Sequence, residues 1–248
     1  MRLDVYLTEK GICRSRSAAQ QLIALGGVSV NGKTAVKNSL EITGSDIVEI
    51  VELKLPRYVG RGGQKLEKAL ELWQIGLNGK TCLDIGSSTG GFSDCMLQNG
   101  AARVFAVDVG SGQLAEKLRA DSRVISLEQT DIRDFSFDDY DIPAAEFIGT
   151  DVSFISLKLV LPHIYRLLAE NGTAVALIKP QFEAGRGSLS KKGIVRDEKV
   201  RLKCVEDIRQ FAGQCGFTVI GTATSPITGG DGNVEYLLAL RKPGKERQ

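Results

Sequence analysis

Apolar residues recur with helical spacing near the start of the chain and then in short alternating runs. A predicted helix has its apolar positions three or four residues apart: Ala18, Ala19, Leu22, Ile23 and Leu25. Ser15 can cap the start of this helix, and Gly26-Gly27 predicts its end. Beyond it, residues 28–30 and 46–50 alternate as strands do, and Asn31-Gly32 predicts a tight turn. This part of the chain is expected to be a compact α+β unit.

From about Gly79 the pattern changes to short apolar runs separated by segments of helical period. The runs predict buried strands over residues 81–85, 104–107, 124–127, 147–149, 174–178, 218–221 and 236–240. The clearest helical segments cover residues 92–98, 157–168 and 198–215. Strands that alternate with helices are typical of a doubly wound α/β domain, whose ligand sites lie at the carboxyl ends of the strands.

A stretch rich in proline and glycine separates the two parts. Pro56, Gly60, Gly62 and Gly63 lie close together there and predict a linker. The expected bounds are 1–55 for the α+β domain, 56–64 for the linker and 65–248 for the α/β domain.

The charge of the chain is unevenly distributed. Its 248 residues carry 32 Lys+Arg and 30 Asp+Glu, a net charge of +2. Residues 1–68 hold eleven Lys and Arg against seven Asp and Glu, a balance of +4, so the remaining residues hold −2. A basic first part is weak evidence that this unit binds a polyanion such as nucleic acid.

Composition excludes several classes of protein. With 42% apolar residues the chain can form a sizeable core, which excludes disorder. Its five cysteines are never spaced C-x-x-C, which argues against disulfides or a zinc site and for a reduced, cytoplasmic protein. His163 is the single histidine, so a His-rich metal site is excluded. No secretion signal and no apolar run of about 18 residues is found, so we expect no membrane association.

The most informative stretch is Asp84-Ile85-Gly86-Ser87-Ser88-Thr89-Gly90-Gly91, which leaves a predicted strand and opens a predicted helix. Its glycines let the backbone turn sharply and approach a ligand closely. The spacing is G-x-x-x-G-G, unlike the G-x-G-x-x-G of dinucleotide-binding loops, and an acid precedes it by two residues. Asp84 would repel a pyrophosphate but attract the ammonium group of an amino-acid ligand.

Two further acids follow the next predicted strands. Asp108 ends the second strand, where a carboxylate can accept hydrogen bonds from both hydroxyls of a ribose. Asp131 follows the third strand, within reach of an adenine amino group. An ammonium, a ribose and an adenine together describe S-adenosylmethionine, so we expect this methyl donor as the cofactor.

Polar side chains at the ends of later strands point to the methyl acceptor. They are Asp151, Lys179 and Glu235. The Asn/Asp-Pro-Pro-aromatic tetrapeptide expected for exocyclic amino groups is absent, and so is the Pro-Cys nucleophile for pyrimidine carbon. Lys179 follows an apolar strand, and desolvation favours a neutral lysine amine, which can take a proton from a hydroxyl. The set therefore favours a hydroxyl acceptor.

At these residues the chain resembles the FtsJ-like ribose 2′-O-methyltransferases, which use a Lys-Asp-Lys-Glu tetrad. With its first part included, the chain resembles the hemolysin A (TlyA) family, in which an S4 RNA-binding domain precedes an FtsJ-like methyltransferase domain. The segments that carry the resemblance are 2–4, 15–17, 28–33, 58–66, 84–91, 151–157 and 179–183.

The resemblance implies a small S4-like domain followed by a Rossmann-like, seven-stranded methyltransferase domain that depends on S-adenosylmethionine. The implied substrate is a ribose 2′-OH of ribosomal RNA, with cytidine as the family's acceptor. Lys179 matches the general base, Asp151 and Glu235 match the residues that orient it, and Lys65 matches the positive charge beside the forming oxyanion. Lys68 is a rival for the position of Lys65.

We expect two sets of binding residues. Those for the cofactor are Asp84, Gly86, Ser87, Ser88, Gly90, Gly91, Asp108 and Asp131. Those for RNA are Arg14, Arg16, Lys33, Lys37 and Arg61.

Two other functions are open at this point. One is an RNA-binding or ribosome-assembly protein without catalysis, which would not need the tetrad. The other is a membrane-lytic hemolysin, which would not need a cofactor loop. Residues 183–196, with four basic residues, one acid and three glycines, are either a loop that closes over substrate or a surface loop without a role.

Overall fold

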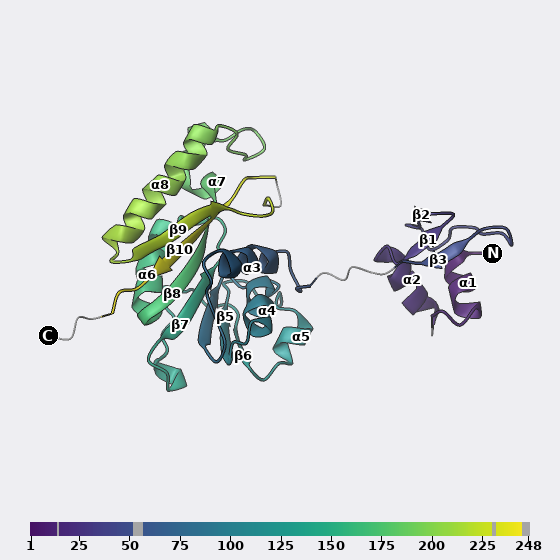
Figure 1. Cartoon of the computed structure of the whole chain (residues 1–248), viewed down its shortest axis with the longest axis horizontal. Helices are drawn as coiled ribbons and strands as arrows, with labels where there is room; N and C mark the ends of the chain where they lie inside the picture. Colours follow the sequence, from purple (N-terminus) through teal and green to yellow (C-terminus); the bar gives the residue numbers. More distant parts are fainter. Residues whose placement is uncertain (14, 52–56, 230–231, 245–248) are drawn as a thin grey trace. The chain divides into compact units, whose positions relative to one another are not determined.

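The computed structural model describes residues 1–13, 15–51, 57–229 and 232–244. By their internal contacts they divide into two compact units, Met1–Pro56 and Arg57–Gln248 (Figure 1).

The first unit packs two helices on a small antiparallel sheet. α1 (Leu3–Glu9) and α2 (Arg16–Ala24) accompany strands in the order β2 (Lys33–Thr34), β1 (Val28–Val30) and β3 (Val48–Ile50). Helices and sheet share one buried core, made of Leu3, Leu7, Ala19, Ile23, Val28, Ala35 and Ile42.

Local predictions for this unit are confirmed at the cap and at the turn. Ser15 Oγ accepts a hydrogen bond from the Ala18 N–H at 3.2 Å, at the start of α2. Asn31 and Gly32 both have positive φ, as a two-residue hairpin turn of type I′ requires. The sequence pattern does not predict α1, because Leu3 and Leu7 provide only one repeat of the helical period.

The second unit is built on a seven-stranded sheet. Its strands are β4 (Thr81–Ile85), β5 (Arg103–Val107), β6 (Val124–Leu127), β7 (Ala145–Thr150), β8 (Leu168–Ile178), β9 (Thr218–Thr224) and β10 (Tyr236–Arg241). They lie in the order β6-β5-β4-β7-β8-β10-β9, and β10 runs antiparallel to both β8 and β9. All seven predicted strands are present. β8 begins earlier than the pattern predicts, because Glu170, Asn171 and Gly172 interrupt its apolar run.

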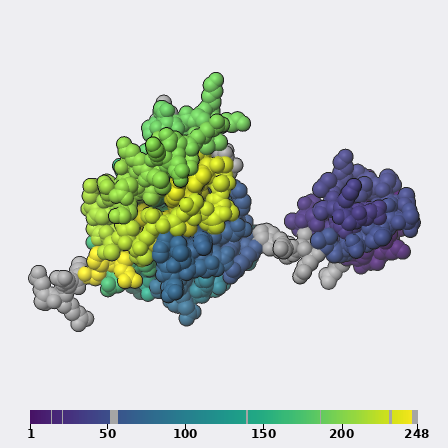
Figure 2. Space-filling view, turned by 45° about the horizontal axis from the view of Figure 1, so that its top comes forward, coloured from purple at the N-terminus to yellow at the C-terminus, as the bar shows by residue number. Residues whose placement is uncertain are grey.

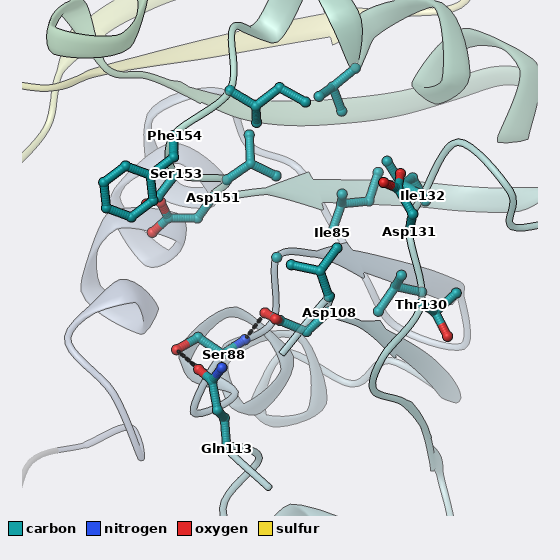
Figure 3. A pocket seen from close by; sticks show the side chains of 16 residues that line it. Ile85, Ser88, Asp108, Gln113, Thr130, Asp131, Ile132, Asp151, Ser153 and Phe154 are labelled. Carbon is teal, nitrogen blue, oxygen red and sulfur yellow. Dashed lines mark hydrogen bonds between the residues drawn. The ribbon is translucent and has the colours of Figure 1, made fainter. Parts of the chain in front are cut away.

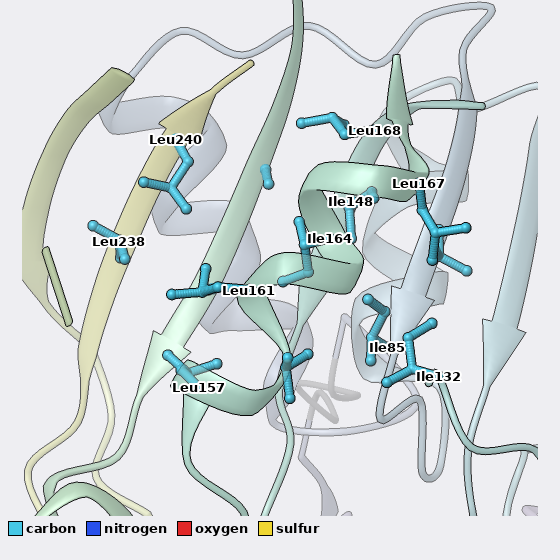
Figure 4. Packing of buried hydrophobic residues seen from close by; sticks show 14 of the residues in the cluster. Ile85, Ile132, Ile148, Leu157, Leu161, Ile164, Leu167, Leu168, Leu238 and Leu240 are labelled. Atoms are coloured by element: carbon cyan, nitrogen blue, oxygen red, sulfur yellow. The ribbon is translucent and has the colours of Figure 1, made fainter. Parts of the chain in front are cut away.

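Helices cover both faces of this sheet, which confirms the doubly wound prediction. α6 (Leu161–Leu167) and α8 (Glu198–Gln214) pack on one face, and α3 (Gly62–Leu72), α4 (Gly91–Gln98) and α5 (Glu116–Arg119) pack on the other. In β5, β8 and β10, alternate residues enter the two cores, one on each face of the sheet, as the pleat of a strand requires. Figure 4 shows the core on the face covered by α6 and α8, where Leu161 and Ile164 of α6 lie among strand residues such as Ile148 and Leu238.

The remaining elements are short. They are α7 (Pro180–Glu183) and the 3-10 helices η1 (Asp138–Tyr140), η2 (Leu157–Leu159) and η3 (Arg186–Ser188). Among the described residues, no helix combines the length and the apolar character needed to cross a membrane.

Part of the segment expected as a linker is instead built into the second unit. α3 begins at Gly62, so residues 62–64 form its first turn. A Cβ on Gly63 would overlap the Tyr58 ring, and a Cβ on Gly91 would lie 2.9 Å from the Gly63 nitrogen. These glycines therefore serve close packing of α3 against α4. Figure 2 shows the C-terminal segment (yellow) beside the segment that contains α3 (blue), and α3 and β10 are in contact.

Candidate active site

Four ionisable side chains form a continuous line of ion pairs at one edge of the seven-stranded sheet. Lys65 Nζ lies 2.7 Å from Glu235 Oε2 and 3.3 Å from Asp151 Oδ2. Lys179 Nζ lies 2.7 Å from the other Asp151 oxygen, Oδ1. Lys65, Lys179 and Glu235 expose only 7%, 8% and 3% of their surface. Each buried charge therefore has an opposite charge in contact, which offsets the cost of removing it from water.

The order and direction of the strands bring three of these residues together. Asp151 follows β7 and Lys179 follows β8, and because β7 and β8 are parallel neighbours both side chains leave the same edge. Glu235 precedes β10, which is antiparallel to β8, with Tyr236 opposite Ile178. The residue before β10 therefore lies beside the residue after β8.

The fourth residue comes from α3, and the structure distinguishes between its two lysines. Lys65 is buried on the side of α3 that also buries Leu66 and Ala69, and it reaches both carboxylates. Lys68 is exposed to solvent. Lys65 is thus the lysine of this helix that the fold brings to Asp151 and Glu235.

A cavity of about 380 Å³ opens beside this cluster, where β4, β5, β6 and β7 end (Figure 3). Its polar wall consists of Ser88, Asp108, Gln113, Thr130, Asp131, Asp151 and Ser153. Apolar side chains, among them Ile85 and Ile132, line the rest. A volume of this size and a mostly apolar wall with a few polar groups are typical of small-molecule sites.

Asp108 is held in the wall of this cavity by backbone N–H groups. Its Oδ2 accepts a hydrogen bond from the Ser88 N–H and its Oδ1 accepts one from the Gly110 N–H, both at 2.7 Å. The Ser88 hydroxyl donates to Gln113 Oε1 at 3.2 Å (Figure 3). Because a carboxylate offers about four acceptor positions, Asp108 can still accept hydrogen bonds from a ligand.

Asp131 also lines the cavity, and it already has a strong partner. Arg133 donates to both of its oxygens, at distances from 2.6 to 3.0 Å. These hydrogen bonds lower the pKa of Asp131 to about 2. Sequence reasoning placed Asp131 at the site but gave no sign of Arg133.

Asp84 lies elsewhere than we expected from the sequence. It is fully buried and does not line the cavity; its Oδ2 accepts hydrogen bonds from the N–H and the hydroxyl of Ser93, in the first turn of α4. Burial raises the pKa of Asp84 to about 7. The side chain therefore anchors α4 to β4 in this structure and does not face a ligand.

The glycine loop has the sharp turns that its composition predicts. Gly86 and Gly90 have φ values of +79° and +94°. A Cβ on Gly86 would lie 2.9 Å from the Asp151 carbonyl oxygen, so only glycine fits beside the end of β7. Ser87 and Gly91 line a smaller cavity of about 190 Å³ that also touches Asp151, Ser153 and Lys179. Gly90 packs against Leu114 and Leu118, away from these cavities.

A third cavity, of about 370 Å³, lies on the other side of the ion-pair line. It is lined by Lys65, Lys179, Glu235, Ser153 and Phe154, by Gln181 and Phe182 of α7, and by Leu189, Gly193, Gly229 and Asn233. The Asn233 amide joins two of its walls, because it accepts a hydrogen bond from the Val195 N–H and donates one to the Gly193 carbonyl, both at 3.2 Å. Part of the loop 183–196 is thus a wall of this cavity. Its closure over a substrate stays a prediction.

Two residues that sequence reasoning missed stand between the cavities. Ser153 lines all three, and its hydroxyl accepts a hydrogen bond from Lys179 Nζ at 2.8 Å. Phe154 lines the two larger ones, is 91% exposed and has a φ of +64°. Its ring centroid lies 5.1 Å from that of Phe182. The only sequence signal for either residue is its place two or three residues after Asp151.

The predicted RNA-binding residues are distributed over both units. Arg16 donates to the fully buried Asp4 at 2.9 Å, and Arg2, which sequence reasoning did not select, donates to both Asp4 oxygens at 3.0 Å. Lys33 and Lys37 line a groove of the first unit. Arg61 is exposed in the second unit, and Arg14 lies outside the described residues.

Both units of the chain match family models, and known proteins are similar to the chain over most of its length. Residues 58–242 match the model described as FtsJ-like methyltransferase, and residues 1–48 match the S4 domain. Hemolysin A of Brachyspira hyodysenteriae is 44% identical, over 96% of this chain and 98% of that protein. The 16S/23S rRNA (cytidine-2′-O)-methyltransferase TlyA of Mycobacterium tuberculosis is 40% identical, over 97% of this chain and 89% of that protein.

Solved structures agree with these matches. A candidate hemolysin from Lactococcus lactis is 54% identical and superposes with a TM-score of 0.74, over 77% of this chain and 91% of that one. An S-adenosylmethionine-dependent methyltransferase from Mesorhizobium loti shares the fold at 13% identity, with a TM-score of 0.56 over 74% of this chain and all of that one.

Proposed function

The chain belongs to the FtsJ-like methyltransferase family, and from this premise we propose that it methylates a ribose 2′-hydroxyl of ribosomal RNA. S-adenosylmethionine is the methyl donor, and a cytidine is the acceptor, as in the name of the relative from M. tuberculosis. The observation that carries the proposal is the line of Glu235, Lys65, Asp151 and Lys179 between two cavities of the size of small ligands.

The cavity beside Asp108 fits an adenosine-containing cation. Asp108 would accept hydrogen bonds from the ribose hydroxyls, Ile132 and the other apolar residues would contact the adenine ring, and Asp131 would face its amino group. Gly86 lets the loop pass close to the end of β7, and Ser87, Ser88 and Gly91 would shape the loop around the methionine part. The net negative charge of the wall suits a positively charged sulfonium.

The residues of the ion-pair line manage the proton of the acceptor. S-adenosylmethionine supplies a methyl group on sulfur, and the sulfur keeps the electron pair of the bond that breaks. Lys179 Nζ takes the proton of the 2′-hydroxyl as the oxygen bonds to the methyl carbon. Asp151 holds this amine in place, and Lys65, fixed by Glu235, places positive charge beside the oxygen as it becomes anionic.

The first unit binds ribosomal RNA through its backbone phosphates. Arg16 and Arg2 are fixed by one buried carboxylate, that of Asp4, so their remaining N–H groups are presented side by side. Lys33, Lys37 and Arg14 add positive charge to the same unit, and Arg61 adds it to the second unit. Such contacts hold the RNA without reading its sequence. With ribosomal RNA as the proposed substrate, we propose the cytoplasm as the place where the protein acts.

Transfer of radiolabelled methyl groups tests the proposal. Purified protein is mixed with labelled S-adenosylmethionine and either intact ribosomal subunits or naked ribosomal RNA, and the product is digested to nucleosides for mass spectrometry. We expect a methyl group on a cytidine ribose. Lys179→Ala should lower kcat by about 100-fold or more and leave the Kd for S-adenosylmethionine within about twofold. A methyl group on a base, or a fully active Lys179→Ala variant, would refute the proposal.

A further inference from the structure

The amine of Lys179 has two close oxygen neighbours in the described part of the chain, one in an ion pair and one in a hydrogen bond. Asp151 Oδ1 lies 2.7 Å from its Nζ, and Ser153 Oγ accepts a hydrogen bond from it at 2.8 Å. Lys179 also lines two of the cavities, those of about 370 Å³ and 190 Å³. Beside these two oxygen contacts, Lys179 therefore also borders open space.

Two such contacts would suffice for the N–H groups of the amine once it has lost a proton. A lysine ammonium has three N–H donors, and after loss of one proton the nitrogen keeps two donors and gains one lone pair. If the two donors are directed to Asp151 and Ser153, the lone pair is left for the third direction, toward the cavity. A general base needs its lone pair, and not an N–H, directed at the acceptor hydroxyl.

The fold holds the Ser153 hydroxyl in the position that this arrangement requires. Phe154 adopts a left-handed backbone conformation directly after Ser153, and its ring packs against Phe182 of α7. On the far side of this turn, Glu183 accepts hydrogen bonds from the Ser156 hydroxyl at 2.6 Å and from the Leu157 N–H at 2.8 Å. The loop that carries Ser153 is thus attached to the same short segment, 179–183, that carries Lys179.

We propose that Ser153 is a positioning residue for methyl transfer, whose hydroxyl fixes the rotation of the neutral Lys179 amine so that its lone pair points at the acceptor oxygen. This inference rests on the proposed function, because it takes Lys179 as the base. Without the serine hydroxyl one N–H loses its acceptor, and the amine turns freely about the Cε–Nζ bond. The lone pair then points at the acceptor for only part of the time.

Steady-state methylation kinetics of the full chain test the inference. Ser153→Ala should lower kcat about 10- to 100-fold, the range expected when a base is misaligned, and leave the KM for RNA and for S-adenosylmethionine within about twofold. Ser153 is exposed, so the extra methyl group of Ser153→Thr has room, and this variant should recover kcat to within about threefold of wild type. Ser136→Ala, which removes a hydroxyl bonded to Asp138, is the matched control and should behave as wild type.

Three results would overturn the inference while leaving the proposed function intact. They are a wild-type kcat in Ser153→Ala, an equal loss in Ser153→Thr, and a raised KM for S-adenosylmethionine without a change of kcat, which would make Ser153 a cofactor contact. Absence of methyl transfer by the wild type would refute the proposed function and the inference together. Measuring the wild type in the same assay therefore distinguishes failure of the inference from failure of the proposed function.

Discussion

The buried Asp84 gives a quantitative prediction for the pH dependence of stability. Its carboxyl group is fully enclosed, its Oδ2 accepts two hydrogen bonds from Ser93, and its Oδ1 has no partner in the described part of the chain. Burial raises its pKa from 3.8 to about 7. In Asp84→Asn the amide oxygen can still accept from Ser93, but the side chain no longer titrates.

The sign and the size of the effect follow from this pKa. Between about pH 4 and pH 7 the folded protein keeps a proton on Asp84 that the unfolded chain has lost, so stability falls as the pH rises. The fall is about 1.4 kcal/mol per pH unit, or about 4 kcal/mol over the whole interval. Asp84→Asn should remove this fall. Its stability relative to wild type should therefore increase with pH up to about pH 7 and then level off.

Urea unfolding at pH 5, 6, 7 and 8 measures this difference. Trp73 is the single tryptophan of the sequence and follows α3, so its fluorescence reports on the second unit alone. Asp121→Asn is the control: Arg123 lowers the pKa of Asp121 to about 2, so this substitution should shift stability equally at all four values. Stability curves for wild type and Asp84→Asn that run parallel from pH 5 to pH 8 would refute the reasoning.

Three further predictions concern the site. Asp108→Ala should weaken binding of S-adenosylmethionine about 100-fold in calorimetry, because two hydrogen bonds of about 1–1.5 kcal/mol each are lost; unchanged affinity would remove Asp108 from the cofactor site. Lys65→Met should lower kcat about 100-fold or more, whereas Lys68→Met should remain within about twofold of wild type, and the reverse order would exchange the two lysines. Phe154→Ala should raise the KM for RNA about tenfold if its exposed ring stacks on a base, and Phe154→Tyr should not; equal KM values would exclude stacking.

Local patterns in the sequence predicted most of the fold, because each depends on residues close in the chain. The cap at Ser15, the turn at Asn31-Gly32 and all seven strands of the large sheet are examples. The glycines from Gly60 to Gly63 predict a linker, because a sequence does not show whether a glycine serves flexibility or close contact. In the structure these glycines pack against Tyr58 and against Gly91 at the start of α4. Local patterns do not relate residues as far apart in the chain as Gly63 and Gly91.

The side on which a strand residue lies explains the different outcomes for Asp84 and Asp108. In β4, Leu83 and Ile85 enter the core beneath α6, whereas Cys82 enters the core beneath α4. Because side chains alternate, Asp84 must lie on the side of Cys82, where Ser93 of α4 reaches it. Asp108 follows the last residue of β5 and is not subject to this alternation. The two-residue alternation of a strand holds up to its final residue. It therefore identifies Asp84, within β4, as a structural acid and Asp108, beyond the end of β5, as an acid that can face a ligand.

Glu235 shows what the direction of a single strand contributes to the site. In a purely parallel sheet, only residues that follow strands reach the ligand-binding edge. Since β10 is reversed, a residue that precedes a strand reaches the same edge, and Glu235 comes within 2.7 Å of Lys65. Gly229 leaves the space for it, because a Cβ there would lie 2.6 Å from Glu235 Oε1. Since a shift of one residue in the register of β10 would turn Glu235 to the other face, the pairing of Tyr236 with Ile178 is as necessary to the ion-pair line as the four charges themselves.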